Sequence, residues 1–178
     1  MNDLSVHYSS KFNRWNTPKH IIPLLLEVLD EIDLDPCSDD ADSPNIPAKV
    51  CYDGRNVDGL SVPWSGKVYM NPPYGRVIGK WVNYATLQHH LENTSEIIML
   101  FPSRTDTVWF RNLWLGTICF VHGRLKFVNK ELPSYREDGN FKVSPAPFPS
   151  AFAYRGKNHR KFAEVFGGIG DIVRPYQY

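Results

Sequence analysis

The sequence lacks the features that mark membrane-spanning, secreted and disulfide-bonded proteins. It contains no run of eighteen apolar residues, so no transmembrane helix is expected. The first fifteen residues hold no apolar core of a signal peptide, so we expect a cytoplasmic protein. The three cysteines, Cys37, Cys51 and Cys119, are an odd and widely spaced set, which fits free thiols in a reducing compartment.

Sequence motifs for common ligands are missing as well. There is no C-x-x-C or Cys/His pairing, and the six histidines show no metal-ligand spacing, so we expect no metal site. No G-x-G-x-x-G occurs, so the usual dinucleotide-binding fingerprint is absent. Lysines and arginines number 20 against 19 aspartates and glutamates, a net charge of +1. A nucleic-acid surface would therefore have to be a local patch.

What is present predicts a single folded domain over residues 1–178, because 42% of the chain is hydrophobic. Apolar runs alternate with amphipathic segments, which predicts an α/β fold with a mostly parallel sheet and helices on both faces. We expect strands at 32–37, 67–70, 96–102, 117–123, 150–155 and 170–176, and one arm of a hairpin at 124–129. We expect helices at 18–31, 77–91, 105–115 and 158–167, and loops at 38–66 and 129–149.

Capping and burial patterns add detail to the expected helices. Thr17 is a candidate N-cap, with Pro18 at the first helical position. Ser103 or Thr105 is the expected cap of the helix at 105–115. In the helix at 77–91 the buried positions are expected to be Val77, Ile78, Trp81, Val82, Ala85 and Leu91.

Polar residues follow three of the expected strands. Asp35, Asn71 and Arg104 each stand at or just after a strand end. In open α/β sheets, ligands bind outside the carboxyl ends of the strands. The sequence therefore predicts a ligand site along this edge.

The segment Asn71-Pro72-Pro73-Tyr74 is the most informative stretch. Two prolines fix two φ angles and remove two backbone donors, so they form a stiff corner. The Asn71 amide oxygen and the Pro72 carbonyl would then be two rigid acceptors, which match an exocyclic NH2 group. Tyr74 offers a face on which a planar ring can stack. The corner favours a site for an amino group on a flat heterocycle, such as adenine N6, over a merely rigid loop.

Other polar residues of this edge have two interpretations each. Asp35 could bind a ribose hydroxyl or an ammonium group, or it could cap a turn or pair with a lysine. Asp58 could accept from the amino group of a cofactor adenine, or it could form an Asp-Gly turn, and Asp53 is its rival. Thr17 and the N–H groups of the helix that follows could hold a carboxylate.

Basic residues are candidates for contacts with nucleic-acid phosphates. Arg104 could bind a phosphate or pair with Asp106. The run 155–161 is the densest basic stretch, and it reads either as a phosphate contact or as a solvated helix start.

Taken in order, the motifs resemble one methyltransferase family. They are W-N-T-P, D-L-D-P-C, D-G-L, V-Y-M-N-P-P-Y-G, P-S-R-T-D-T-V-W-F, G-R-L-K-F and P-S-A-F, which span residues 15–155. This series resembles the phage-type DNA N6-adenine methyltransferase (Dam) family. The resemblance implies a Rossmann-like fold with a reversed hairpin near its end. It also implies transfer of a methyl group from S-adenosylmethionine to adenine N6 in double-stranded DNA, in a bacterial or phage-infected cell, where it would protect DNA from restriction.

The resemblance also assigns roles to residues. The catalytic residues would be Asn71, Pro72, Pro73 and Tyr74. The cofactor-binding residues would be Trp15, Thr17, Asp35, Pro36, Cys37, Asp58 and Asn71. The DNA-binding residues would be Arg76, Arg104, Arg155, Lys157 and Arg160. Methyltransferases acting on RNA or on protein glutamine share similar tetrapeptides, and a non-catalytic nucleic-acid-binding module of this fold is a further alternative.

The sequence departs from the larger adenine methyltransferases at two places. The segment DPCSDDAD stands where they have a glycine-rich cofactor loop. No separate target-recognition domain fits between the motifs, so recognition is expected from loops within 38–66 or 129–147, or from the partner in a homodimer.

Overall fold

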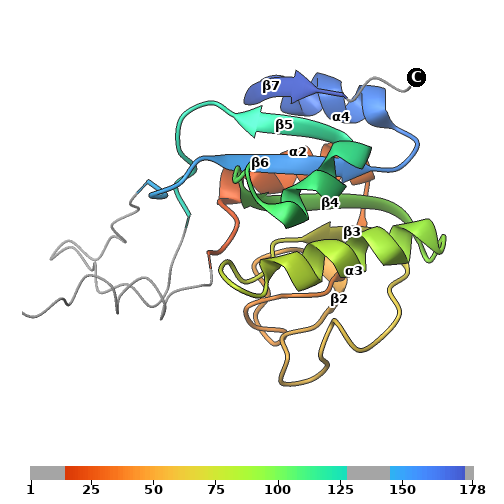
Figure 1. Ribbon diagram of the computed structural model, residues 1–178. Coiled ribbons are helices and arrows are strands. Elements are labelled where there is room, and N and C mark those ends of the chain that lie inside the picture. The colour runs from red at the N-terminus through yellow and green to blue at the C-terminus, as the bar shows by residue number, and fades with distance from the viewer. Residues whose placement is uncertain (1–14, 128–144, 175–178) are drawn as a thin grey trace, which may run out of the picture.

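A computed structural model describes residues 15–127 and 145–174, which form one seven-stranded sheet flanked by helices (Figure 1). The strands are β1 Ile32–Asp35, β2 Ala48–Cys51, β3 Gly66–Met70, β4 Thr94–Pro102, β5 Thr117–Val121, β6 Ser150–Arg155 and β7 Gly170–Val173. The helical elements are η1 Lys19–Ile21, α2 Ile22–Leu29, α3 Ile78–His90, η2 Val108–Leu115 and α4 His159–Phe166.

The sheet is half parallel and half antiparallel. The strand order is β2-β1-β3-β4-β6-β5-β7. The pairs β1–β2, β1–β3 and β3–β4 are parallel, whereas β4–β6, β5–β6 and β5–β7 are antiparallel. The expectation of a mostly parallel sheet is therefore correct only for β2 to β4. The α/β class is confirmed. Strand β6 lies between β4 and β5 and runs antiparallel to both.

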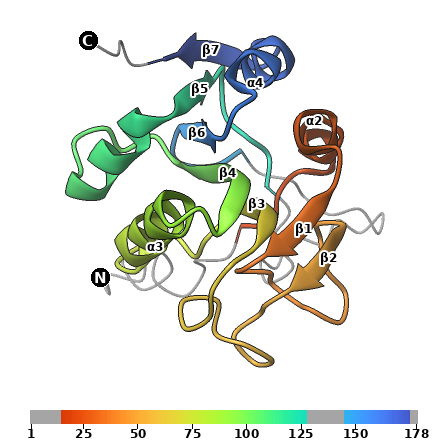
Figure 2. The same ribbon diagram turned by 90° about the vertical axis from the view of Figure 1, so that its right-hand side faces the viewer.

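Helices cover both faces of the sheet. Figure 2 shows α3 and η2 on one side and α2 and α4 on the other, and each pair is in contact. Leu25 and Leu29 of α2, spaced four apart on one helix face, are fully buried against the sheet. Strand β4 is buried from Glu96 to Pro102, because helices pack on both of its faces. No helix among the described residues is long and apolar enough to cross a membrane.

Several local expectations are corrected. Strand β2 forms inside the expected loop 38–66, where it pairs with β1 at the sheet edge. The helix expected at 105–115 is the 3-10 helix η2, whose N-cap is Thr107. Val77 and Leu91, expected in the core, are 39% and 56% exposed because they lie at the two ends of α3.

Candidate active site at the carboxyl edge of the sheet

Three parallel strands end in the same region of the molecule. The carboxyl ends of β1, β3 and β4 lie at one edge of the sheet, so the loops that follow Asp35, Met70 and Pro102 are neighbours. The segment 15–17 runs across this edge, where it contacts residues from β3 and from both loops after β1 and β3. The predicted convergence of strand ends is thus seen.

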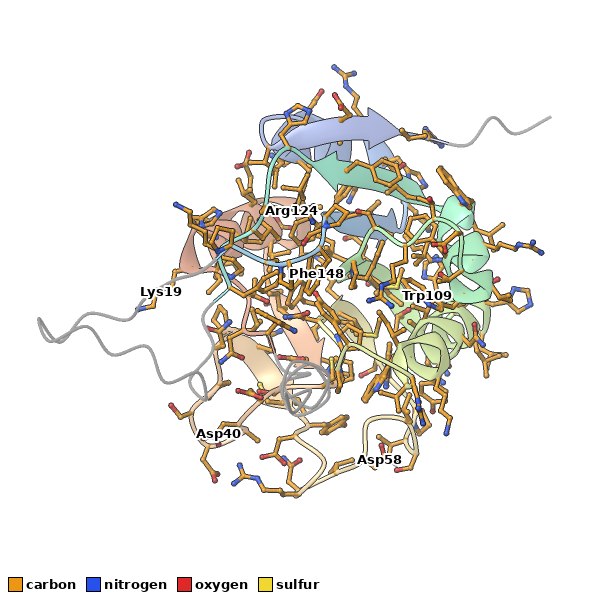
Figure 3. The ribbon with its side chains drawn as sticks, turned by 60° about the vertical axis from the view of Figure 1, so that its left-hand side comes forward. Lys19, Asp40, Asp58, Trp109, Arg124 and Phe148 are labelled. Carbon is orange, nitrogen blue, oxygen red and sulfur yellow. The ribbon has the colours of Figure 1, made fainter. Side chains whose placement is uncertain are left out.

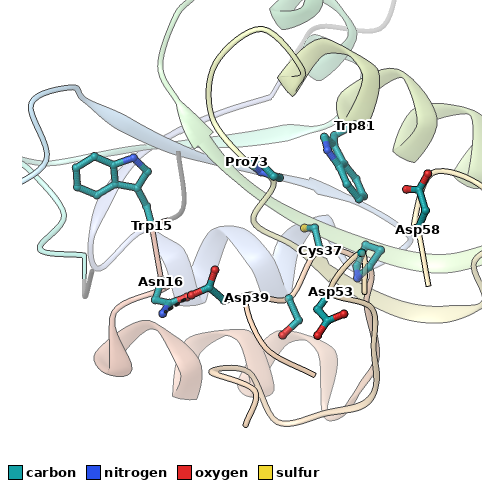
Figure 4. A pocket seen from close by; sticks show the side chains of 12 residues that line it. Trp15, Asn16, Cys37, Asp39, Asp53, Asp58, Pro73 and Trp81 are labelled. Carbon is teal, nitrogen blue, oxygen red and sulfur yellow. Dashed lines mark hydrogen bonds between the residues drawn. The ribbon is translucent and has the colours of Figure 1, made fainter. Parts of the chain in front are cut away.

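A cavity of about 150 Å³ lies at this edge (Figure 4). It is lined by five residues from the predicted site: Trp15, Pro36, Cys37, Asp58 and Pro73. The seven further lining residues are Asn16, Ser38, Asp39, Asp53, Gly54, Gly59 and Trp81, of which the sequence had offered Asp53 as the rival of Asp58. Trp81 comes from α3, where its position in the apolar pattern predicted only a core residue, so the three-dimensional packing is what assigns it to the cavity.

The side-chain amide of Asn71 is held in one orientation. Its Nδ2 donates to the carbonyl oxygen of Trp15 at 2.5 Å and to Oγ1 of Thr17 at 3.2 Å. Its Oδ1 is buried and has no hydrogen-bond partner among the described residues. A buried acceptor without a donor is costly, so this oxygen has the character of a site for a ligand N–H group.

The Thr17 hydroxyl connects Asn71 to Tyr69 of β3. Thr17 Oγ1 lies 2.7 Å from the Tyr69 hydroxyl, and the two residues are 1% and 0% exposed. The expected N-cap role of Thr17 is wrong, because the 3-10 helix η1 has Pro18 at its N-cap and no side-chain cap bond. The hydroxyl instead forms hydrogen bonds within the site. Asn45 Nδ2 holds the backbone of the same residue by donating to the Thr17 carbonyl at 2.9 Å.

Tyr74 belongs to an aromatic cluster that we define as Trp15, Tyr74, Phe127 and Phe148. The Tyr74 ring meets Phe148 edge-on at 5.4 Å, and the Trp15 ring meets Phe127 at 5.6 Å and Phe148 at 5.4 Å between centroids. Tyr74 is 5% exposed, and its buried hydroxyl has no partner among the described residues. Burial raises the pKa of this phenol well above its usual value. A small cavity of about 50 Å³ lies between Tyr74, Phe148, Arg104 and Trp109.

Asp35 is a buried carboxyl group at the end of β1. It is 5% exposed, and its Oδ1 accepts from the backbone N–H of Cys37 at 3.1 Å. Burial raises the pKa of Asp35 to about 7, and the bond from Cys37 offsets only part of that rise. A cavity of about 20 Å³ is lined jointly by Asp35, Thr17 and Asn71, so three of the predicted residues meet here.

The two rival aspartates of the following loop have different surroundings. Asp53 accepts from the backbone N–H groups of Ala41, Arg55 and Asn56 and from the Arg55 guanidinium, and these bonds hold the pKa of its carboxyl well below the usual range. Asp53 thus stabilises the loop. Asp58 accepts from the N–H of Leu60 at 3.0 Å, so the turn that was one interpretation of Asp58 is present at the wall of the cavity.

Gly59 permits the close contact between this turn and the loop after β1. A Cβ atom at this position would lie 2.1 Å from the carbonyl oxygen of Pro36. Trp64 Nε1 also donates to the Gly59 carbonyl at 2.7 Å. Only glycine allows the Asp58 turn and Pro36 to line one cavity.

The candidate DNA-binding residues fall into two separate groups. Arg76 and Arg104 are exposed and follow β3 and β4 at the site edge, and Arg104 forms no ion pair with Asp106. Of the other three candidates, Arg155 is the last residue of β6, and Lys157 and Arg160 follow it. Strand β6 runs antiparallel to β4 and ends at the opposite edge.

The structure therefore does not bring this second group to Asn71. Arg155 is 7% exposed and donates to the Asn112 carbonyl, while Arg160 pairs with Glu164 at 2.7 Å on α4. Lys157 and Arg160 are exposed at the start of α4, which is the alternative interpretation of the run 155–161 as a solvated helix start. In the described part of the chain no group of three or more His, Cys, Asp or Glu side chains could hold a metal ion.

Of the comparisons with known proteins, the one with protein families agrees with the motif order. A search of curated proteins found no match. A comparison with protein families matches residues 5–155 to the family described as Dam, DNA N-6-adenine-methyltransferase. This match spans most of the 178 residues and includes every element from η1 to β6. The chain belongs to the Dam family of DNA N-6-adenine-methyltransferases.

Proposed function

We propose that this protein transfers a methyl group from S-adenosylmethionine to N6 of an adenine that has left the DNA duplex. The observation that carries the proposal is the amide of Asn71. Its Nδ2 is fixed by two hydrogen bonds, and its Oδ1 is buried without a partner among the described residues. Asn71 lines the cavity of about 20 Å³, whose wall also includes Asp35 and Asp39. A fixed, unpaired acceptor at the end of β3 is suited to the N–H groups of an adenine amino group.

The cavity of about 150 Å³ has the chemistry of a site for S-adenosylmethionine, which is cationic. Asp39 and Asp58 contribute carboxylates to its wall, while the carboxylate of Asp53 is bonded within its own loop, and Pro36 and Trp81 contribute apolar surface. Carboxylates suit the ammonium group, the ribose hydroxyls and the adenine amino group, and apolar surface suits the adenine ring. When bound, S-adenosylmethionine supplies an electrophilic methyl group carried by a sulfonium.

The aromatic cluster would receive the target base. Taking an adenine out of the stack costs a few kcal/mol. Stacking against an aromatic side chain such as Tyr74 or Phe148 offsets roughly 1–3 kcal/mol of that cost. Because Tyr74 is held edge-on by Phe148, its ring is fixed before the base arrives.

Asn71 and Pro72 would orient the reacting nitrogen. Asn71 Oδ1 and the Pro72 carbonyl each accept one N6–H, which favours a tetrahedral nitrogen with its lone pair directed at the methyl group. No general base is needed before transfer, because the N6 proton becomes acidic only as the new N–C bond forms. That proton then leaves to solvent. Positioning and exclusion of water supply most of the rate acceleration.

The test is methyl transfer from labelled S-adenosylmethionine to unmethylated duplex DNA, followed by digestion to nucleosides. We expect the label in N6-methyladenine. Label only in RNA or in protein glutamine, offered in parallel, would contradict the DNA assignment. Failure to bind S-adenosylmethionine would indicate a non-catalytic module.

Asn71→Ala tests the role of the amide within the same assay. We expect methyl transfer to fall more than tenfold, since a transition-state contact is lost, while cofactor affinity measured by calorimetry changes little. Equal activity of the variant and the natural protein would refute the proposed role of Asn71.

A further inference from the structure

A second, larger groove lies at the site edge of the sheet. This open cavity of about 590 Å³ lies between η1, the loop after β5 and the start of β7. Four basic side chains line it, and we call them together the basic groove: His20, His122, Arg124 and Lys126. Its remaining lining is apolar or glycine, including Ile21, Leu125 and Ile169. Among the described residues, no carboxylate lines this cavity.

The chain segment that carries two of these cations also reaches the aromatic cluster. From Arg124 to Phe127 the exposure alternates, with Arg124 and Lys126 exposed and Leu125 and Phe127 buried. Ala146 fixes this extended segment, because its N–H donates to the Leu125 carbonyl at 2.9 Å. Phe127 is part of the aromatic cluster, so the segment that lines the basic groove also contributes a ring to the predicted base site.

The cations of the groove are available to a ligand. No described carboxylate forms an ion pair with Arg124 or Lys126, and only His122 has an acidic neighbour, Asp171 at 3.0 Å. By contrast, Lys49 and Arg55 elsewhere on the surface are each paired with carboxylates at 2.9 Å or less. An unpaired arginine–lysine pair beside a base site suits phosphate groups.

Charge is unevenly distributed along the site edge. The loops that follow β1 and β2 carry Asp39, Asp40, Asp53 and Asp58. The loops that follow β4 and β5 carry Arg104, Arg124 and Lys126. Figure 3 shows Asp40 and Asp58 on one side of Phe148 and Arg124 on the other. The acidic groups described on the basic side are Asp106 and Asp171. A polyanion is therefore attracted to the β4–β5 half and repelled from the half with the cofactor cavity.

We infer that the basic groove binds the phosphate backbone of the DNA strand that presents the target adenine, with Arg124 and Lys126 as the principal contacts. This inference rests on the proposed function. It places the bound DNA on the β5 side of the site edge, away from β2. Neither residue was among the DNA-binding candidates found from the sequence, which emphasised the denser run at 155–161. Backbone contacts of this kind are independent of base sequence, so they can be tested without knowing the recognition site.

The test compares two double variants that lose the same charge. Arg124→Gln/Lys126→Gln removes the groove cations, and Lys161→Gln/Arg174→Gln removes an arginine and a lysine that are exposed on α4 and after β7. Because all four side chains are exposed, both variants should fold, which thermal melting checks. Affinity for a labelled, unmethylated DNA duplex is then measured by fluorescence polarisation over about 50–200 mM salt.

For the groove variant we expect a slope of log Kobs against log salt that is smaller by about 2, from about 0.9 per lost phosphate contact. Affinity at 0.1 M salt should fall on the order of tenfold or more, and the KM for DNA in methyl transfer should rise while kcat at saturating DNA is kept. The control variant should keep the natural slope.

Groove and control variants with the same slope and affinity would overturn the inference, while methylation by the natural protein would leave the proposed function standing. If the natural protein methylates RNA or protein in place of DNA, the proposed function fails, and this inference fails with it.

Discussion

At the scale of single residues, the site depends on how one amide is oriented. Thr17 Oγ1 accepts from Asn71 Nδ2 at 3.2 Å and lies 2.7 Å from the Tyr69 hydroxyl. This chain of buried groups directs the nitrogen of Asn71 toward the protein and leaves its oxygen without a partner among the described residues. The same threonine was expected beside the carboxylate of the cofactor, so its hydroxyl has two competing roles that a substitution can separate.

Thr17→Val keeps the shape of the side chain and removes the hydroxyl. We expect kcat to fall about tenfold, corresponding to one lost hydrogen bond of about 1.4 kcal/mol, with little change in the KM for S-adenosylmethionine. Thr17→Ser should restore kcat because it keeps Oγ. A raised KM for the cofactor with unchanged kcat would instead assign the hydroxyl to cofactor binding.

Asp35 gives the protein a pH-dependent stability. Its folded-state pKa of about 7 lies above the ordinary value of 3.8, so the folded protein binds more protons than the unfolded chain between these values. The free energy of unfolding therefore falls as pH rises through this window, by up to about 1.4 kcal/mol per pH unit from this group. Above pH 7 the contribution is constant.

Asp35→Asn removes this titration. We expect the stability of the variant relative to the natural protein to increase from pH 4 to pH 7 and then to level off. Urea unfolding of both proteins at pH 4.5, 5.5, 6.5 and 7.5 measures the difference in their free energies of unfolding. Because all other groups titrate alike in the two proteins, their contributions cancel. A difference that does not change with pH would show that Asp35 is ionised normally in the fold.

At the scale of elements, strands that are buried on both faces could be predicted, whereas the edge strand could not. Strand β4 is a continuous apolar run, and its sequence identifies it without reference to the rest of the chain. Strand β2 has a half-exposed pattern within a stretch rich in proline, aspartate and glycine, and it forms only because β1 offers a pairing edge.

Strand direction explains which of the candidate residues lie at the predicted edge of the sheet. Asp35 and Asn71 follow parallel strands, so their order in the chain was enough to bring them to one edge. Lys157 and Arg160 follow β6, a fully buried strand that reads like a parallel one, but its antiparallel pairing puts them at the other edge. Phe148 joins Tyr74 through packing across 74 residues of sequence, which no local pattern reports.

At the scale of the whole molecule, the cavity that we propose for the cofactor is lined by parts of the chain that lie far apart in the sequence. The segment at Trp15, the loops after β1 and β2 and the corner at Pro73 all line it. A ligand that binds only the folded state stabilises it by RT ln(1 + [L]/Kd), about 2.7 kcal/mol at 100 times Kd. For a chain of this size we expect S-adenosylmethionine at that concentration to raise the Tm by roughly 5–10 °C.

Two substitutions at Asp58 determine how much of the rise in Tm caused by the cofactor depends on the side-chain oxygen of this residue. Asp58→Asn keeps an oxygen for the N–H of Leu60 and for an adenine amino group, so both the free Tm and the rise should stay near those of the natural protein. Asp58→Ala loses both contacts. Measured from its own free Tm, its rise should be smaller at the same cofactor concentration, by the equivalent of about 1.4 kcal/mol or a tenfold weaker Kd. An undiminished rise in Asp58→Ala would remove Asp58 from the cofactor site and leave it only the turn.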